Sequence, residues 1–272
     1  MVDILEELFG CVKPVIGMIH LPPLPSSPRY REEGMEYVLE HALRDAEALK
    51  EGGVDGVQVE NIGDKPFMKP SQITDETITI VAIIAREVRK ATGLPTGVFV
   101  LANGIEESIS AALASGAKWI RANMYNLAYI ADEGFVESAA SKAERRKTNL
   151  RTDVKIFADV LVKHGSHFLT QDLPLEYKVA QLEETGAEAI IVSGERTGAE
   201  TPVDRVKKVK QIATKPILIG SGLTPENAGT LLAIADGAIV GTYLKKEGKL
   251  QNPIDINRVK KLMQVVKRIR VT

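Results

Sequence analysis

The chain has little cysteine, few aromatic residues and no long apolar run in its 272 residues. Cys11 is the only cysteine, which excludes an intrachain disulfide or a multi-cysteine metal site and is typical of a reducing compartment. No stretch reaches the roughly 18 uninterrupted apolar residues that a membrane-spanning helix needs. The first ten residues carry Asp3, Glu6 and Glu7 where a signal peptide would have basic and then apolar residues. We therefore expect a cytoplasmic protein with at most peripheral membrane contact.

Strong charge of one sign and metal-binding motifs are also missing. The formal net charge is -1, and no cluster of Lys and Arg is interleaved with aromatic residues, so a nucleic-acid partner is not expected. Neither a His-Glu-x-x-His motif nor a Cys/His cluster occurs, so we predict no transition metal and no cofactor. Mg²⁺ held weakly by carboxylates stays an open alternative. Hydrophobic residues make up 44% and charged residues 26% of the chain, a balance typical of a folded domain with a sizeable core.

A joint between a helix and a strand recurs along the chain. Small residues and glycine close a predicted helix at 53–56, 116–118, 186–188 and 235–237, and apolar segments follow at 57–60, 119–121, 189–192 and 238–240. Between these joints lie four more apolar segments, at 15–19, 98–101, 154–162 and 217–219, and three of the four have a proline just upstream. Eight strands alternating with helices predict a single (β/α)8 barrel over residues 1–272. An open, doubly wound sheet is the alternative. Residues 1–10 predict a short extra helix across the barrel floor.

The most specific functional signal lies at the ends of the seventh and eighth predicted strands. Glycines there would let backbone N–H groups approach an anion, and we expect a phosphate site formed by Gly220, Ser221, Gly222, Gly241 and Thr242. Thr224 as N-cap and Pro225 as first helical residue predict the start of the next helix. The alternative is that these glycines only turn strands into helices. Barrels of this class favour phosphate binding at this location.

Ionisable residues at other strand ends are candidates for proton transfer: His20, Glu60, Asp159, Lys163 and His164. The rigid proline-rich loop after His20 would hold its side chain in place. Asp159 and Lys163 are four residues apart, so an unbroken strand would present both on one face. The alternatives are a structural His20, a Glu60 salt-bridged inside the barrel, and a His164 in a surface loop.

Further polar residues at strand ends are candidates for holding a substrate: Asn61, Asp64, Asn103, Arg121, Asn123 and Ser193. Arg121 could clamp a carboxylate or phosphate, or it could pair with Glu60 or Asp159 as a buried support. Asp64 and Ser193 could equally serve turns. The segment 124–134 is expected to be a loop that folds over the barrel mouth and excludes water, and 137–151 a charged helix.

Several of these segments together resemble the BtpA family, also called the photosystem I biogenesis protein family. The matching segments are 17–25 (GMIHLPPLP), 59–67 (VENIGDKPF), 158–164 (ADVLVKH), 192–198 (VSGERTG), 220–227 (GSGLTPEN) and 236–242 (DGAIVGT). Where the family commonly has an Arg-Asn-Asp-like end to the third strand, this chain has Ala102-Asn103-Gly104. No charged role is therefore expected at that position.

The resemblance implies a phosphate-binding barrel whose enzymatic activity is poorly defined. Some members of the family are linked to photosystem I accumulation and membrane association, and others have been labelled nucleosidases. Our first hypothesis is an enzyme, a homo-oligomer, acting on a small phosphorylated sugar or a nucleoside- or ribose-phosphate-like metabolite as a lyase, isomerase or nucleosidase. The alternative is a non-catalytic assembly factor for a membrane protein complex. Fold resemblance alone does not transfer the photosystem role.

Overall fold

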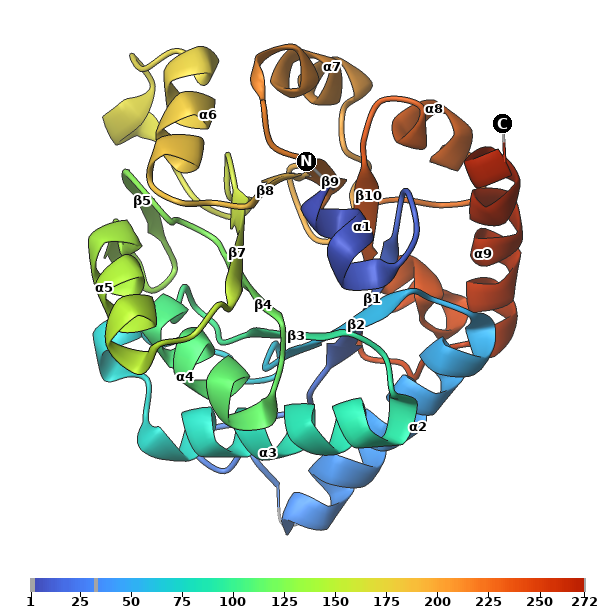
Figure 1. The fold of residues 1–272 in the computed structure, drawn as a ribbon. Coiled ribbons are helices and arrows are strands. Elements are labelled where there is room, and N and C mark those ends of the chain that lie inside the picture. Colours follow the sequence, from blue (N-terminus) through green and yellow to red (C-terminus); the bar gives the residue numbers. More distant parts are fainter. Residues whose placement is uncertain (1–2, 32–33, 272) are drawn as a thin grey trace.

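Eight parallel strands close into a barrel in the computed structural model, which describes residues 3–31 and 34–271 (Figure 1). The strands follow one another around the barrel as β1 (Val15–His20), β2 (Gly56–Glu60), β3 (Thr96–Phe99), β4 (Trp119–Ala122), β7 (Lys155–Asp159), β8 (Ala189–Val192), β9 (Ile217–Ile219) and β10 (Gly237–Val240). Nearly all of their residues are buried, as expected of parallel strands covered on both faces. The predicted (β/α)8 barrel is confirmed.

Helices surround the barrel, one after each strand of the barrel (Figure 1). They are α2 (Gly34–Gly52), α3 (Asp75–Thr92), α4 (Ile105–Ser115), α5 (Ala140–Leu150), α6 (Leu175–Glu184), α7 (Val203–Ile212), α8 (Ala228–Leu232) and α9 (Ile256–Val271). Short 3₁₀ turns lie at Pro70–Gln72, Phe168–Thr170, Thr242–Leu244 and Lys246–Gly248. Within the described residues no helix combines the length and apolar character needed to cross a bilayer.

The extra N-terminal helix α1 (Ile4–Phe9) lies across one end of the barrel (Figure 1). The Asp3 side chain caps it by accepting a hydrogen bond from the Leu5 N–H at 2.8 Å. Leu5 is buried in the same apolar cluster as Trp119 and Phe157 from the strands. The predicted floor helix is confirmed, and Met1 and Val2 of its predicted span lie outside the described residues. The amino-terminal end of the barrel is therefore packed with apolar side chains.

Two segments differ from the sequence prediction. The apolar run 154–162 is a strand only over Lys155–Asp159, because its neighbours β4 and β8 end their pairing at Ala158 and Asp159. The prediction that strand alternation places Asp159 and Lys163 on one face is therefore wrong. The segment 124–134 is more than a loop, since β5 (Ala128–Ala131) and β6 (Gly134–Glu137) pair in an antiparallel hairpin. The helix predicted from residue 137 begins at Ala140, because Glu137 is still paired with Ala128.

Gly97 makes room for the largest side chain in the barrel. A Cβ at residue 97 would lie 2.2 Å from Trp119 Nε1, whose N–H donates a hydrogen bond to Gln58 Oε1 at 2.9 Å. Trp119 is fully buried, so Gly97→Ala is expected to lower the free energy of unfolding by about 1–3 kcal/mol through overpacking. Denaturant unfolding measures the change. Gly229→Ala is the control, because no atom lies within 4 Å of a Cβ there and alanine favours the α8 helix. Equal stability of the two variants would contradict this account.

Candidate functional site

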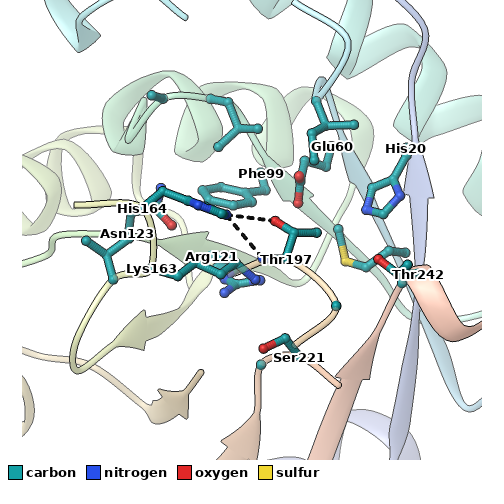
Figure 2. Close-up of a pocket in the computed structure, with 18 of the residues that line it drawn as sticks. His20, Glu60, Phe99, Arg121, Asn123, Lys163, His164, Thr197, Ser221 and Thr242 are labelled. Atoms are coloured by element: carbon teal, nitrogen blue, oxygen red, sulfur yellow. Dashed lines mark hydrogen bonds between the residues drawn. The ribbon is translucent and has the colours of Figure 1, made fainter. Parts of the chain in front are cut away.

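A cavity of about 390 Å³ opens at the carboxyl ends of the strands, opposite the floor helix α1. A volume of this size suits a small ligand. Eleven of the predicted site residues line it: His20, Glu60, Arg121, Asn123, Lys163, His164, Gly220, Ser221, Gly222, Gly241 and Thr242. Figure 2 shows Glu60 and His20 on one side of the cavity with Thr242 beneath His20, Asn123 and Lys163 on the other side, and Ser221 at the bottom. The tertiary structure therefore brings the two glycine-rich strand ends and the ionisable residues to one opening.

The glycine corner, defined here as Gly220, Ser221, Gly222, Gly241 and Thr242, is closely packed. A Cβ at residue 222 would lie 2.3 Å from the Ala199 carbonyl oxygen, and one at 220 would lie 2.3 Å from Ser193 Oγ. Gly222 also has a backbone φ of +71°, which residues other than glycine rarely adopt. A Cβ at Gly241 would lie 2.8 Å from His20 Cε1. These glycines do more than turn strands into helices, since they let the loops after β8 and β9 and the His20 ring pack against the corner.

Several donors of the glycine corner and the turn after it have no acceptor among residues 3–31 and 34–271. Among the described residues, no group accepts a hydrogen bond from the backbone N–H of Ser221, Gly222, Thr242 or Tyr243. The Thr242 hydroxyl oxygen is buried and likewise has no partner among the residues described. Ser221 is buried and the other three residues are half-buried at the cavity wall. Unpaired backbone donors that line one cavity are suited to an anion.

Burial shifts the pKa of two ionisable residues that line the cavity, His20 and Glu60. It lowers the pKa of His20 well below 6.5, with the charges of Lys245, Lys163 and Arg121 acting in the same direction. His20 Nδ1 is buried without a hydrogen-bond partner among the described residues. Burial raises the pKa of Glu60 above 4.5, partly opposed by Arg121 and Lys163. The site therefore holds a neutral imidazole beside a carboxyl group that retains its proton to higher pH than usual.

Arg121 and Asp159 form a buried support beneath the cavity. Arg121 Nε donates to Asp159 Oδ2 at 2.8 Å and Nη2 donates to Oδ1 at 2.9 Å, while the Ser193 hydroxyl donates to Oδ1 at 2.8 Å. Arg121 lines the cavity and also lies over the Phe99 ring, with Cζ 5.4 Å from the ring centroid. Asp159 and Ser193 do not line it. Of the two predicted roles for Arg121, the structure has the buried ion pair with Asp159. Asp159 is held by this ion pair and does not line the cavity.

Three predicted substrate-binding residues instead tie loops together. Asn61 Nδ2 donates to Asp64 Oδ2 at 2.9 Å, and Asn61 Oδ1 accepts from the Leu101 N–H at 2.7 Å. Asp64 Oδ1 accepts from the Leu24 N–H at 2.7 Å, which fixes the proline-rich loop after β1. Asn103 bonds through its side chain to both backbone groups of Met124. None of the three lines the cavity, although all are buried.

His164 and the hairpin form the rim of the cavity. His164 is exposed, and its Nε2 accepts a hydrogen bond from the Thr197 N–H at 3.2 Å and lies 2.9 Å from the Thr197 hydroxyl. Tyr129 of β5 also lines the cavity, and its hydroxyl donates to Glu133 at 2.9 Å. The sequence analysis missed Tyr129 because the pattern of 124–134 predicted no strands. The β5–β6 hairpin belongs to the segment that was predicted to fold over the barrel mouth, and several of its residues line the cavity.

The helix after the glycine corner starts later than predicted. Thr224 is not an N-cap, since α8 begins at Ala228 with Asn227 before it. Asn227 Oδ1 accepts from the Thr224 N–H at 2.8 Å and Asn227 Nδ2 donates to the Gly222 carbonyl at 2.9 Å. These bonds stabilise a turn at 225–227, which delays the helix. Asn227 thereby holds the backbone of Gly222 in place.

A buried ion pair behind His20 also escaped the sequence analysis. Lys245 Nζ lies 2.6 Å from Asp45 Oδ2, and both side chains are almost fully buried. Asp45 Oδ1 accepts a further hydrogen bond from the Ile254 N–H at 3.0 Å. In the part of the chain that the structure describes, no group of three or more His, Cys, Asp or Glu residues is arranged to hold a metal ion.

The architecture and the cavity define a (β/α)8 barrel with ionisable groups gathered at the carboxyl ends of its strands. The family model of the BtpA family matches residues 11–268. The chain belongs to the BtpA family, as the resemblance of its motifs implied. Among its relatives, the photosystem I biogenesis protein BtpA of Synechocystis sp. is 35% identical over 264 residues, covering 96% of this chain and 91% of the relative. An uncharacterized protein of Pyrococcus furiosus is 39% identical over 262 residues, covering 96% and 97%.

Solved structures share the fold at low sequence identity. The N-(5'-phosphoribosyl)anthranilate isomerase of Pyrococcus furiosus aligns with a TM-score of 0.58 and 14% identity, covering 94% of this chain and 99% of the isomerase. At this identity the likeness shows the barrel fold alone.

Proposed function

We propose that this protein is an enzyme that binds a small phosphorylated metabolite, with the phosphate held by the glycine corner and protons moved by Glu60 and His20. The unpaired N–H groups of Ser221, Gly222, Thr242 and Tyr243 are the observation that carries the proposal. Phosphate oxygens are the acceptors that such donors bind most readily. The solved isomerase acts on a phosphoribosyl compound by its name, which agrees with this assignment.

The chemistry available in the cavity is proton transfer. Burial raises the pKa of Glu60, and its carboxyl group has no hydrogen-bond partner among the described residues, which suits a general acid or base. His20 is neutral, since burial lowers its pKa, and would donate or accept a hydrogen bond rather than carry charge. Proton transfer by such groups is a step common to lyase, isomerase and nucleosidase reactions on a sugar phosphate. Activity as a nucleosidase, a homo-oligomeric state and a cytoplasmic location stay predictions of the sequence.

Ligand-induced thermal stabilisation tests the phosphate site. Ribose 5-phosphate and inorganic phosphate are expected to raise the melting temperature, because a ligand at 100 times its Kd adds about 2.7 kcal/mol to the free energy of unfolding. Ribose without phosphate is the matched control and is expected to shift it far less. If neither phosphate compound changes the melting temperature at saturating concentration, the proposal is wrong.

The alternative of a non-catalytic assembly factor draws on the name of the Synechocystis relative. The unpaired polar groups of the cavity favour the enzyme, because a scaffold has no need for them. The enzyme and the assembly factor are expected to respond differently to a double variant, His20→Ala with Glu60→Gln. An enzyme loses its function in this variant while it still folds, whereas an assembly factor keeps it.

A further inference from the structure

Lys163 presents an unpaired amine to the cavity. It follows β7 and lines the cavity together with Glu60 and Arg121 (Figure 2). Within residues 3–31 and 34–271, neither a carboxylate nor another acceptor binds its Nζ. The contrast with Lys245 is clear, since that buried lysine is paired with Asp45 at 2.6 Å. Lys163 is half-buried and lines the cavity, so its amine is placed to contact a ligand there rather than held in a structural ion pair.

The surroundings of Lys163 increase the share of its neutral amine relative to an exposed lysine. Burial and the neighbouring Arg121 guanidinium lower its pKa to about 8, although Asp159 and Glu60 act in the opposite direction. Arg121 already neutralises Asp159 through two hydrogen bonds, so that carboxylate is not available as a partner for Lys163. A lysine in a cavity next to another cation is the arrangement that activates an amine as a nucleophile.

We propose that Lys163 Nζ forms an imine with the carbonyl carbon of a phosphorylated aldehyde or ketone whose phosphate lies at the glycine corner. The inference rests on the proposed function, because it uses the same cavity and the same phosphate site. It goes further by naming the substrate class and a covalent step. Open-chain sugar phosphates belong to this class.

The step balances without an oxidant or reductant. The amine attacks the carbonyl carbon, a C–N bond forms, and the carbonyl oxygen takes a proton to give a carbinolamine. The nitrogen then loses a proton, the hydroxyl group gains one, and the C–O bond breaks to release water. Glu60 supplies the proton to the leaving hydroxyl group, because burial raises the pKa of its carboxyl group above the usual value. The resulting protonated imine draws electrons from the adjacent carbon, as lyase and isomerase reactions require.

Reductive trapping tests the imine. The whole protein is incubated with sodium cyanoborohydride and, separately, glyceraldehyde 3-phosphate, dihydroxyacetone phosphate or ribose 5-phosphate, and peptides are mapped by mass spectrometry. At least one probe is expected to add its mass less one oxygen atom at Lys163, about tenfold faster than at any exposed lysine. Lys163→Met removes this adduct. Lys65→Met is the matched control, because Lys65 is an exposed lysine at the rim of the same cavity, and it keeps the adduct on Lys163.

The pH dependence of trapping provides a second measurement. Only the neutral amine attacks, so the rate at Lys163 is expected to rise about tenfold per pH unit below pH 8 and to level off above it, whereas exposed lysines with a pKa of about 10.4 continue to gain reactivity. A Lys163 profile that follows the exposed lysines up to pH 10 overturns the proposal.

Two further outcomes separate the imine from the proposed function. If inorganic phosphate raises the melting temperature but none of the three probes labels Lys163, the imine is wrong and the phosphate site stands. If Lys163 is labelled equally fast by unphosphorylated glyceraldehyde, and phosphate does not compete, the phosphorylated substrate class is wrong. The melting temperatures of Lys163→Met and Lys163→Arg show whether loss of the adduct reflects loss of folding.

Discussion

Gly222→Ala is expected to weaken binding of a phosphorylated ligand by about 100-fold, the loss that follows when roughly two charge-assisted hydrogen bonds from backbone N–H groups are displaced. The added Cβ would lie 2.3 Å from the Ala199 carbonyl oxygen and 2.4 Å from Glu200 Cα, so the loops after β8 and β9 must separate. These are backbone atoms, which cannot rotate away as a flexible side chain would. Isothermal titration with ribose 5-phosphate measures the change in affinity.

Gly93→Ala is the matched control for Gly222→Ala. Gly93 has φ of +69°, almost the same as the +71° of Gly222, so both variants suffer similar backbone strain. No atom lies within 4 Å of a Cβ at Gly93, which ends helix α3 away from the cavity. The control is expected to lose stability without losing affinity. If both variants bind the phosphorylated ligand with equal affinity, the glycine corner is not part of the binding site.

Arg121→Met is expected to lower the free energy of unfolding by about 3–5 kcal/mol, because it leaves the Asp159 carboxylate buried without its counter-ion. The two side chains are 4% and 0% exposed, so water cannot take over the lost hydrogen bonds. Among the described residues, the Ser193 hydroxyl would remain as the donor to the carboxylate. Urea unfolding monitored by circular dichroism measures the loss.

An exposed ion pair and a double variant serve as controls for Arg121→Met. Lys249 and Glu247 lie 2.7 Å apart with more than half of each side chain exposed, so Lys249→Met is expected to cost less than about 1 kcal/mol. Arg121→Met combined with Asp159→Leu is expected to recover most of the stability, since no buried charge remains. If the single variant at Arg121 loses no more than Lys249→Met, the support role of the buried pair is wrong.

Local patterns in the sequence were enough to predict the barrel and to place the glycine corner at the ends of its last two strands. The helix-to-strand joints and the apolar segments are properties of neighbouring residues, and a parallel barrel places every strand end at one opening. His20, Glu60, Gly222 and Thr242 could therefore be assigned to one site from their positions at strand ends. The bounds of β7 and the hairpin β5–β6 were not predicted, because strand length depends on where neighbouring strands end.

The sequence by itself determined which residues reach the carboxyl end of the barrel, and the tertiary structure decided what each of them does there. Asp159 and Lys163 look equally available for chemistry in the sequence, yet Asp159 is bound by Arg121 and Ser193 while Lys163 has no partner among the described residues. Pairing of this kind joins residues as far apart as Asp45 and Lys245 along the chain. Burial and partner choice set the pKa of each group, and both arise only when the loops pack together.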